Sequence, residues 1–379
     1  MKKNSRLFKA GFLVICLLLL VACGGSQASA KPQIVFGLAG PMTGDDADYG
    51  VNLQRGVSLA VDEINAAGGI NGQPVKLEVC DDKADPATAS LCAQKFASES
   101  YIFATIGNVN STCTLAAGPI LDKAGVTDIT GDSTNPQVTQ MGWTHMFRTI
   151  VNDSLQGPVM AQIAVKTMGK SKLAIMYVNS DYGKGLLDAT TPAITKLGAT
   201  MVDAESYTPG DKDFSAQLTK IAQAQPDALL LLTDYTEGGL IAQQRIAAGL
   251  GNIALIASAG NEHQDFISLG GAGAEGAFVM SYFDPNQPTP LMTDFVAKFK
   301  AKYNLTPNEQ GGYGYEIPYI YKWAIDQGAT KATLPTVLHT IDYKGLTGEI
   351  QFTATGDLAN GSQYILQVQN GQFISYVPK

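Results

Sequence analysis

The sequence predicts an α/β protein with two lobes, each built on a mostly parallel sheet flanked by helices. From Gln33 onward, apolar runs of strand length alternate with amphipathic segments of helix length. This order is typical of parallel sheets that helices cover on both faces. The chain has 379 residues, of which 45% are hydrophobic and 16% charged. It is therefore long for one domain but has enough apolar side chains for two cores.

The apolar runs place the strands in order along the chain. The first helix follows the first strand, because the apolar residues from Leu53 to Ile64 recur with the helical period, and it ends at Gly68-Gly69. Asp85-Pro86 begins the second helix, which runs to about residue 98. Helices fill the later gaps, and strands are expected at residues 34–38, 75–79, 101–106, 126–129, 145–148, 172–178, 200–204, 228–232, 253–257 and 277–281.

Two polar, proline-containing stretches interrupt this alternation, at residues 152–158 and 283–290. We expect the chain to cross between the lobes there. Beyond residue 290 the pattern predicts helices at 291–303 and 312–327, then strands at 345–352 and 364–368. The first lobe is therefore predicted to comprise residues 33–151 plus 285–345, and the second residues 152–284 plus 346–379.

The N-terminus is typical of an exported lipoprotein. Lys2, Lys3, Arg6 and Lys9 precede an apolar run at residues 10–22, which is shorter than the roughly 20 residues that span a bilayer. The run ends in Leu20-Val-Ala-Cys23, and a Gly- and Ser-containing tether follows. We expect residues 1–22 to be a signal peptide, Cys23 to be the lipidated first residue, and residues 23–32 to be the tether of a protein held on the membrane outside the cytoplasm. The alternative is an ordinary signal peptide that is cut near Ala30.

The charge of the chain excludes several kinds of partner. Removal of residues 1–22 takes away four basic groups and no acidic ones, so 22 basic and 34 acidic residues remain and the net charge is −12. An acidic protein of this kind is repelled by phosphates, which argues against nucleic-acid binding and against adhesion to anionic lipid without a covalent anchor.

Besides the lipidated Cys23, three cysteines remain in the mature chain, namely Cys80, Cys92 and Cys113. An oxidising compartment permits one disulfide and leaves one thiol. The sequence does not choose the pair, although Cys92 and Cys113 are favoured because both are expected near the starts of neighbouring helices. Their spacings match no metal-binding motif, so no metal site is predicted.

Two strand-to-helix turns form the candidate binding site. At residues 104–118 a strand ends at Gly107. Ser111 and Thr112 follow and are candidate N-caps of the next helix. At residues 129–136 a second strand again opens into glycine and hydroxyl groups. A helix N-terminus with free N–H groups and nearby hydroxyls suits a small carboxylate. The alternative is that these hydroxyl residues only cap helices.

Several motifs, in this order, resemble the branched-chain amino-acid binding proteins of ABC transporters. They are Gly40-Pro-Met-Thr-Gly44, the stretch from Ala60 to Gly72, Asp81-Asp82 before Asp85-Pro86, and the stretch from Asp213 to Leu218. The resemblance covers most of residues 33–283 and is weaker beyond. It implies a type I periplasmic-binding-protein fold with three crossovers between the lobes, closure about a hinge on a small ligand without a cofactor, and delivery of that ligand by a monomer to a membrane permease.

The resemblance also implies the residues of the site. Ser111 and Thr134 fall where the family holds the ligand carboxylate, and tyrosines fall where the family lines its cleft. A tyrosine offers an apolar wall and one hydroxyl, which fits a zwitterion with an apolar side chain. The expected ligand-binding residues are Ser111, Thr134, Tyr49, Tyr182, Tyr235, Asp132, Ser133, Val109 and Asn110.

The sequence departs from the family at the partner of the ligand's ammonium group. The family places an acidic residue after the strand expected at 253–257, where this chain has Ala259. Asp132, Asp234 and Glu262 are the candidate replacements. Alternatively, the ligand has no ammonium group and is an aromatic or aliphatic acid or an amide, or the protein is a sensor that signals without transport.

An enzymatic function is disfavoured. Residues 271–276 fit G-x-G-x-x-G, but the motif precedes an expected strand, whereas a dinucleotide fingerprint follows one. The only histidines are His145, His263 and His339, and there is no G-x-S-x-G nucleophile motif.

Overall fold

The structure, a computed structural model, describes residues 32–377. The predicted signal peptide, Cys23 and all but the last residue of the predicted tether lie outside the described residues. None of the described helices is both long and apolar enough to cross a membrane.

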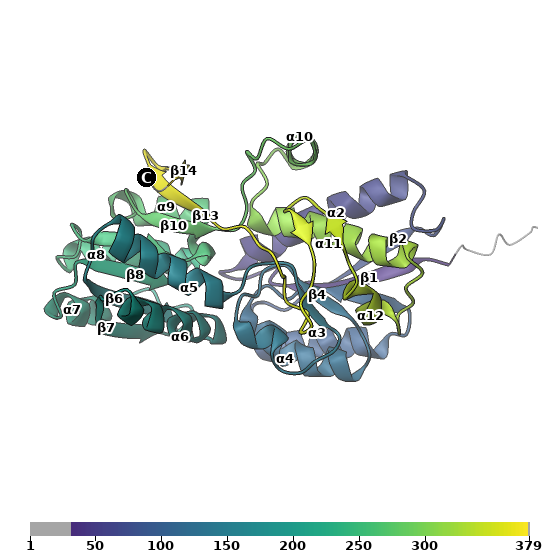
Figure 1. The fold of residues 1–379 in the computed structure, drawn as a ribbon, viewed down its shortest axis with the longest axis horizontal. Coiled ribbons are helices and arrows are strands. Elements are labelled where there is room, and N and C mark those ends of the chain that lie inside the picture. Colours follow the sequence, from purple (N-terminus) through teal and green to yellow (C-terminus); the bar gives the residue numbers. More distant parts are fainter. Residues whose placement is uncertain (1–31, 378–379) are drawn as a thin grey trace, which may run out of the picture. The chain divides into compact units, whose positions relative to one another are not determined.

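The first sheet contains only parallel pairs, and its strand order is β2-β1-β3-β4-β5. Its helices lie between successive strands, as the alternating pattern predicts (Figure 1). The elements are β1 (Ile34–Gly40), α2 (Ala47–Ala66), β2 (Val75–Asp81), α3 (Pro86–Ser98), β3 (Ile102–Ile106), α4 (Ser111–Lys123), β4 (Asp128–Thr130), η1 (Pro136–Thr139) and β5 (Met146–Arg148).

The second sheet has the order β14-β13-β10-β9-β8-β6-β7. The pairs from β7 to β10 are parallel, whereas β13 and β14 are added in antiparallel fashion. Its elements are α5 (Asp153–Gln162), η2 (Ile163–Thr167), β6 (Lys172–Val178), α6 (Asp181–Lys196), β7 (Thr200–Tyr207), α7 (Ser215–Gln223), β8 (Ala228–Leu232), α8 (Tyr235–Ala247), β9 (Ala254–Ala257), η3 (Ala259–Asn261), α9 (Gln264–Gly270), η4 (Gly271–Gly273), β10 (Phe278–Ser281), β13 (Tyr364–Gln369) and β14 (Gln372–Tyr376).

The described chain passes between the two sheets three times: after β5, after β10 and before β13. After the second passage, α10 (Pro290–Tyr303), α11 (Glu309–Asp326) and α12 (Leu334–Leu338) return to the first lobe. Helix α11 lies against α2 at positions without side chains: a Cβ on Gly56 would lie 2.1 Å from the Gly311 carbonyl oxygen, and one on Gly314 would lie 2.4 Å from the Leu53 carbonyl oxygen. Glycine therefore permits the close approach of these two helices.

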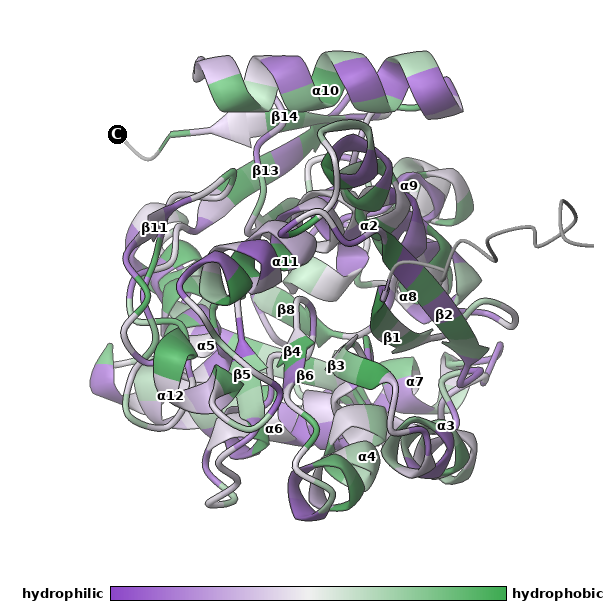
Figure 2. Ribbon diagram, turned by 90° about the vertical axis from the view of Figure 1, so that its right-hand side faces the viewer, coloured by the Kyte–Doolittle hydropathy of each residue, from purple (hydrophilic) through white to green (hydrophobic). Residues whose placement is uncertain are grey.

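The burial pattern agrees with sheets that are covered on both faces. Strands β1 and β8 are buried along their whole length. In Figure 2, β1 has hydrophobic colouring, whereas α10 alternates between hydrophilic and hydrophobic residues along its turns. Helix α10 buries Met292, Phe295 and Phe299 against the first lobe and leaves its other faces to solvent.

The C-terminal region corrects two predictions. The strand expected at 345–352 is instead a hairpin of two short strands, β11 (Tyr343–Lys344) and β12 (Glu349–Ile350). The chain then stays on the first lobe, where the fully buried Arg148 forms an ion pair with Asp357 at 2.8 Å. The lobe boundary predicted between residues 345 and 346 is therefore too early. The buried guanidinium of Arg148 needs an acidic partner, and that partner, Asp357, comes after residue 346 in the chain.

Candidate functional site

The predicted carboxylate site is formed by the start of α4 and the loop after β4. The N-cap of α4 is Asn110, not Ser111 or Thr112, and its side chain makes no capping hydrogen bond within the described chain. The first N–H groups of a helix have no partner inside the helix, so those of α4 remain available to a ligand. The Ser111 hydroxyl accepts a hydrogen bond from the Asn135 N–H at 3.2 Å, and its own proton remains free to be donated.

Glycine and a buried hydroxyl network hold this site in place. Gly107 has φ +138°, and a Cβ there would lie 2.1 Å from the Ala39 carbonyl oxygen, so the end of β3 requires glycine. The Ser133 hydroxyl is fully buried, 2.5 Å from the Thr114 hydroxyl and 2.9 Å from the Val109 carbonyl oxygen. Ser133 therefore supports the turn and does not line the cavity, contrary to its predicted role as a ligand-binding residue.

A cavity of about 240 Å³ lies between the lobes, beside these turns. Of the predicted residues, Tyr49, Val109, Asn110, Ser111, Asp132, Thr134, Tyr182 and Asp234 line it, whereas Ser133, Tyr235 and Glu262 do not. Thr112, which the sequence indicated only as a candidate N-cap, also lines it, and the lining residues that the sequence did not indicate include Asp46, Gln156, Tyr282, Glu309 and Gln310.

Tyrosines join the two lobes at the edge of the cavity. The Tyr235 hydroxyl donates to the Asp45 carbonyl oxygen at 2.8 Å, and the ring of Tyr235 lies edge-on to that of Tyr49 with centroids 4.8 Å apart. The Tyr49 hydroxyl in turn donates to the Gly260 carbonyl oxygen of the second lobe. Tyr182 stays within the second lobe, where its hydroxyl donates to the Ser258 hydroxyl at 2.8 Å. Tyr235 therefore bridges the lobes instead of lining the cleft.

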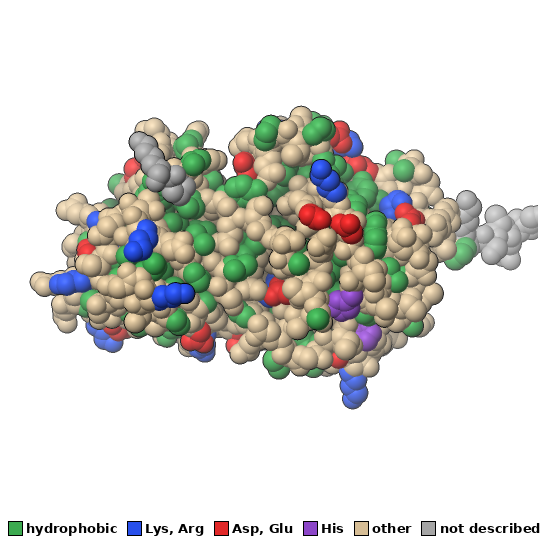
Figure 3. Space-filling model, in the orientation of Figure 1, with side chains coloured by type: hydrophobic (Ala, Val, Ile, Leu, Met, Phe, Trp, Pro, Cys, Tyr) green, Lys and Arg blue, Asp and Glu red, His purple; other side chains and the backbone are tan. Residues whose placement is uncertain are grey.

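Four carboxyl groups face the cavity: Asp46, Asp132, Asp234 and Glu309. Among the described residues, no lysine, arginine or histidine lines it. On the face shown in Figure 3, by contrast, acidic and basic side chains are scattered over the surface. Among the described residues the cavity therefore has acidic but no basic side chains, and one of the acids, Asp46, accepts a hydrogen bond from Asn110 at the start of α4 at 2.8 Å.

Burial and mutual repulsion shift the pKa values of these groups. Burial raises the pKa of Asp132 to about 7, although a hydrogen bond from the Gln310 amide at 3.2 Å opposes this shift. Burial, and then the charge of Asp132, raises the pKa of Glu309 well above its usual range. Burial, followed by the charge of Asp46, has the same effect on the pKa of Asp234. Burial raises the pKa of Asp46 itself to about 6, against a hydrogen bond from Asn110. Each carboxyl therefore lacks a positive partner within the described chain.

Residues 33–372 match the family model described as periplasmic binding protein. The chain belongs to this family. Leu/Ile/Val-binding protein homolog 3 of Brucella melitensis is 32% identical over 356 residues, which cover 92% of this chain and 95% of the relative.

Two solved structures share the fold of this periplasmic binding protein. A leucine-binding protein from Thermotoga maritima has a TM-score of 0.84 and 27% identity over 91% of this chain and 98% of its own. A branched-chain amino acid transporter substrate-binding protein from Streptococcus pneumoniae, in complex with isoleucine, has a TM-score of 0.83 and 27% identity over 91% of this chain and 100% of its own. The type I periplasmic-binding-protein fold and the branched-chain amino-acid branch of the family are thereby confirmed. The family is extracytoplasmic and serves ABC transporters, and these relatives are binding proteins, not enzymes.

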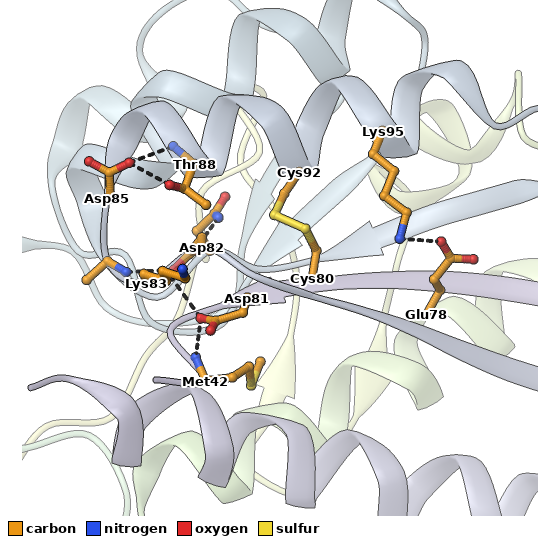
Figure 4. Close-up of a disulfide and its surroundings, with 12 residues drawn as sticks. Met42, Glu78, Cys80, Asp81, Asp82, Lys83, Asp85, Thr88, Cys92 and Lys95 are labelled. Atoms are coloured by element: carbon orange, nitrogen blue, oxygen red, sulfur yellow. Dashed lines mark hydrogen bonds and ion pairs between the residues drawn. A yellow bond between two sulfur atoms is a disulfide. The ribbon is translucent and has the colours of Figure 1, made fainter. Parts of the chain in front are cut away.

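The disulfide of this binding protein joins Cys80 to Cys92, whose Cα atoms are 5.8 Å apart, while Cys113 is free and buried (Figure 4). The favoured pairing of Cys92 with Cys113 is wrong, because Cys92 lies on the second turn of α3 and faces the end of β2. At the same end of β2, Asp81 accepts the Met42 N–H at 2.8 Å and the Lys83 N–H at 3.0 Å, which fixes the loops that follow β1 and β2.

Glu262, the third candidate ammonium partner, does not line the cavity. Burial raises its pKa to about 8, and the hydroxyl of Ser281 and the charge of Asp284 act on it there. The acids that the sequence missed, Asp46 and Glu309, stand at the N-termini of α2 and α11. Their position immediately before or at a helix start could have been predicted from the sequence. That both helices begin at the same cavity is visible only in the tertiary structure.

Proposed function

We propose that this protein is the solute-binding receptor of an ABC importer and that it binds a free amino acid between its lobes. The lobes close on the ligand about the three crossovers, and the loaded receptor delivers the amino acid to a membrane permease. We further propose that Cys23 carries lipid that anchors the receptor to the membrane; the intact mass of membrane-extracted protein tests this, and a mature chain that starts beyond Gly24 without acyl groups would contradict it.

The proposal rests on one observation: one part of the cavity offers hydrogen-bond donors for an anion, and another part offers acidic groups for a cation. The start of α4 offers N–H groups and the Ser111 hydroxyl, which suit a carboxylate. The acidic groups that line the rest of the cavity suit an ammonium group. A free amino acid carries both charges on one carbon, and the cavity volume of about 240 Å³ suits a small ligand.

Asp234 is the proposed replacement for the acid that the family places near Ala259. A Cβ on Gly260 would lie 3.3 Å from Asp234 Oδ1, so this carboxylate reaches the backbone next to Ala259 from a neighbouring strand. Ala259 itself lines the cavity, and its N–H donates to Gln156 Oε1 at 2.8 Å. On this proposal, the acid that pairs with the ammonium group stands on the loop after β8, next to the loop after β9 where the family has it.

A ligand without an ammonium group is the competing function. An aromatic or aliphatic acid would fit the start of α4 but would bring a negative charge among four carboxyl groups. We therefore expect mass spectrometry of the small molecule released from the unfolded protein to identify a compound with both amine and carboxyl groups. An acid that lacks an amine would overturn the proposal.

Asp132→Asn provides an independent test of the same question. Neutralising Asp132 should weaken amino-acid binding in calorimetric titration, whereas binding of a carboxylate-only ligand should stay equal or become tighter. For the transport role, uptake of labelled ligand should be lost in cells that lack the protein. A receptor that only signals would leave uptake unchanged.

A further inference from the structure

Asparagine side chains cap three helices of the described chain other than α4. The side-chain oxygens of Asn135, Asn152 and Asn308 each accept an N–H from the turn that follows, at 2.8, 2.9 and 3.1 Å. Asn110 is the N-cap of α4 and has an extended backbone, with φ −75° and ψ 131°, as a capping residue does. Its side chain nevertheless makes no capping hydrogen bond within the described chain.

Asp46 holds the Asn110 side chain away from the capping position. Asn110 Nδ2 donates to Asp46 Oδ2 at 2.8 Å, across 64 positions of the sequence. This bond leaves Asn110 Oδ1, the atom that would cap α4, buried and without a hydrogen-bond partner in the described structure. Asp46 is itself the N-cap of α2 and makes no side-chain capping bond there either. The N-cap side chains of α2 and α4 therefore bond to each other instead of to their own helices.

The unused cap lies at the start of α4, which is the proposed carboxylate site. Asp46, Asn110, Ser111 and Thr112 all line the cavity. An asparagine N-cap oxygen accepts the N–H of the second or third helical residue, which in α4 are Thr112 and Cys113. These N–H groups are among those that would bind an anion at the helix start. The Asn110 oxygen, if it were released to cap α4, would therefore compete with a ligand carboxylate for the same donors.

We propose that Asp46 is a positioning residue of the binding site, which keeps Asn110 from capping α4 and so leaves the helix N–H groups free for the ligand carboxylate. The inference rests on the proposed function and adds to it a role for one acid that requires no contact with the ligand's ammonium group. Both residues belong to the first lobe, so their hydrogen bond does not depend on contacts with the second lobe.

Asp46→Ala and Asp46→Asn separate this role from the charge of Asp46. Both variants remove the negative charge, but the asparagine keeps an oxygen that accepts the Asn110 Nδ2 group, whereas alanine has none. Calorimetric titrations with L-leucine are made at pH 8, because burial raises the pKa of Asp46 to about 6 and the carboxyl is ionised there. Asp46→Ala should bind leucine at least about fivefold more weakly than Asp46→Asn, which is the effect of one competing cap. Equal affinities would overturn the proposal.

The same two variants in an Asn110→Ala background provide the control. Without the Asn110 side chain there is no cap to release, so Asp46→Ala and Asp46→Asn should then differ by less than about twofold. A difference that persists undiminished in this background would show that Asp46 acts on the ligand by another route and would overturn the positioning role.

A measurement without ligand keeps this inference distinct from the proposed function. In ligand-free Asp46→Ala, the released Asn110 oxygen should cap α4, so the N–H of Thr112 or Cys113 should exchange with deuterated water about fivefold or more slowly than in the wild type. Asp46→Asn should exchange like the wild type. Unchanged exchange in Asp46→Ala would overturn the inference whichever ligand binds. Slower exchange in a protein that binds no amino acid would instead support the role of Asp46 and contradict the proposed function.

Discussion

Helices α4 and α8 both begin at the cavity, and neither is capped by its own N-cap side chain. The first turn of α4 contains no acidic residue of its own, although its N-cap Asn110 donates a side-chain hydrogen bond to Asp46 at 2.8 Å. Helix α8 instead has Asp234 as its N-cap and Glu237 in its first turn. The two helix starts therefore differ in charge, because only α8 supplies acidic residues of its own at its start.

The comparison shows that a helix N-terminus does not by itself determine which ion it binds. The partial positive charge of the helix end amounts to roughly half an elementary charge, and one carboxylate placed there exceeds it. At α4 the dipole and the free N–H groups favour an anion, whereas at α8 the aspartate reverses that preference. Because the N-termini of α4 and α8 lie at the same cavity, that cavity suits a molecule that carries a negative and a positive charge on separate atoms.

The largest expected effect comes from making α4 resemble α8. Ser111→Asp places a negative charge beside the ligand carboxylate, and a like charge about 4 Å away costs about 4 kcal/mol, or roughly 1,000-fold in affinity. Ser111→Asn is the matched control of the same size without charge. Calorimetric titration should show the additional loss only for the aspartate variant; equal binding by both variants would argue against a carboxylate at this helix start.

Removing single donors at α4 should have an intermediate effect. Ser111→Ala or Thr134→Ala removes one hydrogen bond to a charged group, about 1.5–3 kcal/mol, so affinity should fall roughly 10- to 150-fold. The Ser111 variant also loses the bond from the Asn135 N–H, which contributes about 1 kcal/mol to folding. Thermal melts measure that part, and variants that lose stability but keep affinity would show that the hydroxyls only support the fold.

The acidic groups of the cavity should make ligand binding depend on pH. With the pKa of Asp132 raised to about 7 and that of Asp46 to about 6, lowering the pH from 8 to 5 protonates the groups that hold the ligand's positive charge. Amino-acid affinity should then fall about tenfold per pH unit for each proton that binding must displace. Titrations across this range check the slope, and pH-independent affinity would contradict the acidic assignment.

The free energy of unfolding of the ligand-free protein should show the opposite pH dependence: it should rise as the pH is lowered, whereas ligand affinity falls. A carboxyl whose pKa is higher in the folded than in the unfolded state stabilises the fold at low pH, and this contribution is lost as the pH rises through the folded value. For Asp132 the loss falls between about pH 4 and 7, at about 1.4 kcal/mol per pH unit. Melting temperatures of the ligand-free protein over this range therefore serve as the control for the binding titrations.

The smallest effect is expected at Cys113, in the first turn of α4. A helix start lowers the pKa of an exposed thiol, but burial raises that of Cys113 well above its ordinary value. Alkylating reagents should therefore leave the folded protein unmodified and label one of Cys80, Cys92 and Cys113 after unfolding without reductant. Rapid labelling of the folded protein would show that the start of α4 is more open than the structure indicates.

Much of the fold was predictable because local patterns specify it. The strand expected at 228–232 is β8 with the same bounds, since five buried aliphatic residues in a row cannot lie on a solvent-exposed helix. Asp85 and Pro86 likewise begin α3 as expected. The pattern failed at 345–352, where glycines and polar residues form a hairpin, and it missed β14, an edge strand with several exposed side chains.

The site, like the fold, was predictable only in part. The turn at Ser111 and the hydroxyl turn at Thr134 were visible in the sequence because glycine, hydroxyl residues and helix patterns are adjacent along the chain. Neither the choice of Cys80 over Cys113 as the partner of Cys92 nor the separation of Ser133 from the cavity could be predicted, because each depends on which side chains face each other across different elements.

The sequence by itself therefore determined the order of strands and helices, the two lobes and the hydroxyl-rich turns, because hydrophobic periodicity and turn chemistry act over short stretches of chain. Only the tertiary structure decided the charge of the cavity. Asp46, Asp132, Asp234 and Glu309 come from four separate helix starts and loops, and their partial or complete burial around one cavity is what raises their pKa values and makes them a site for positive charge.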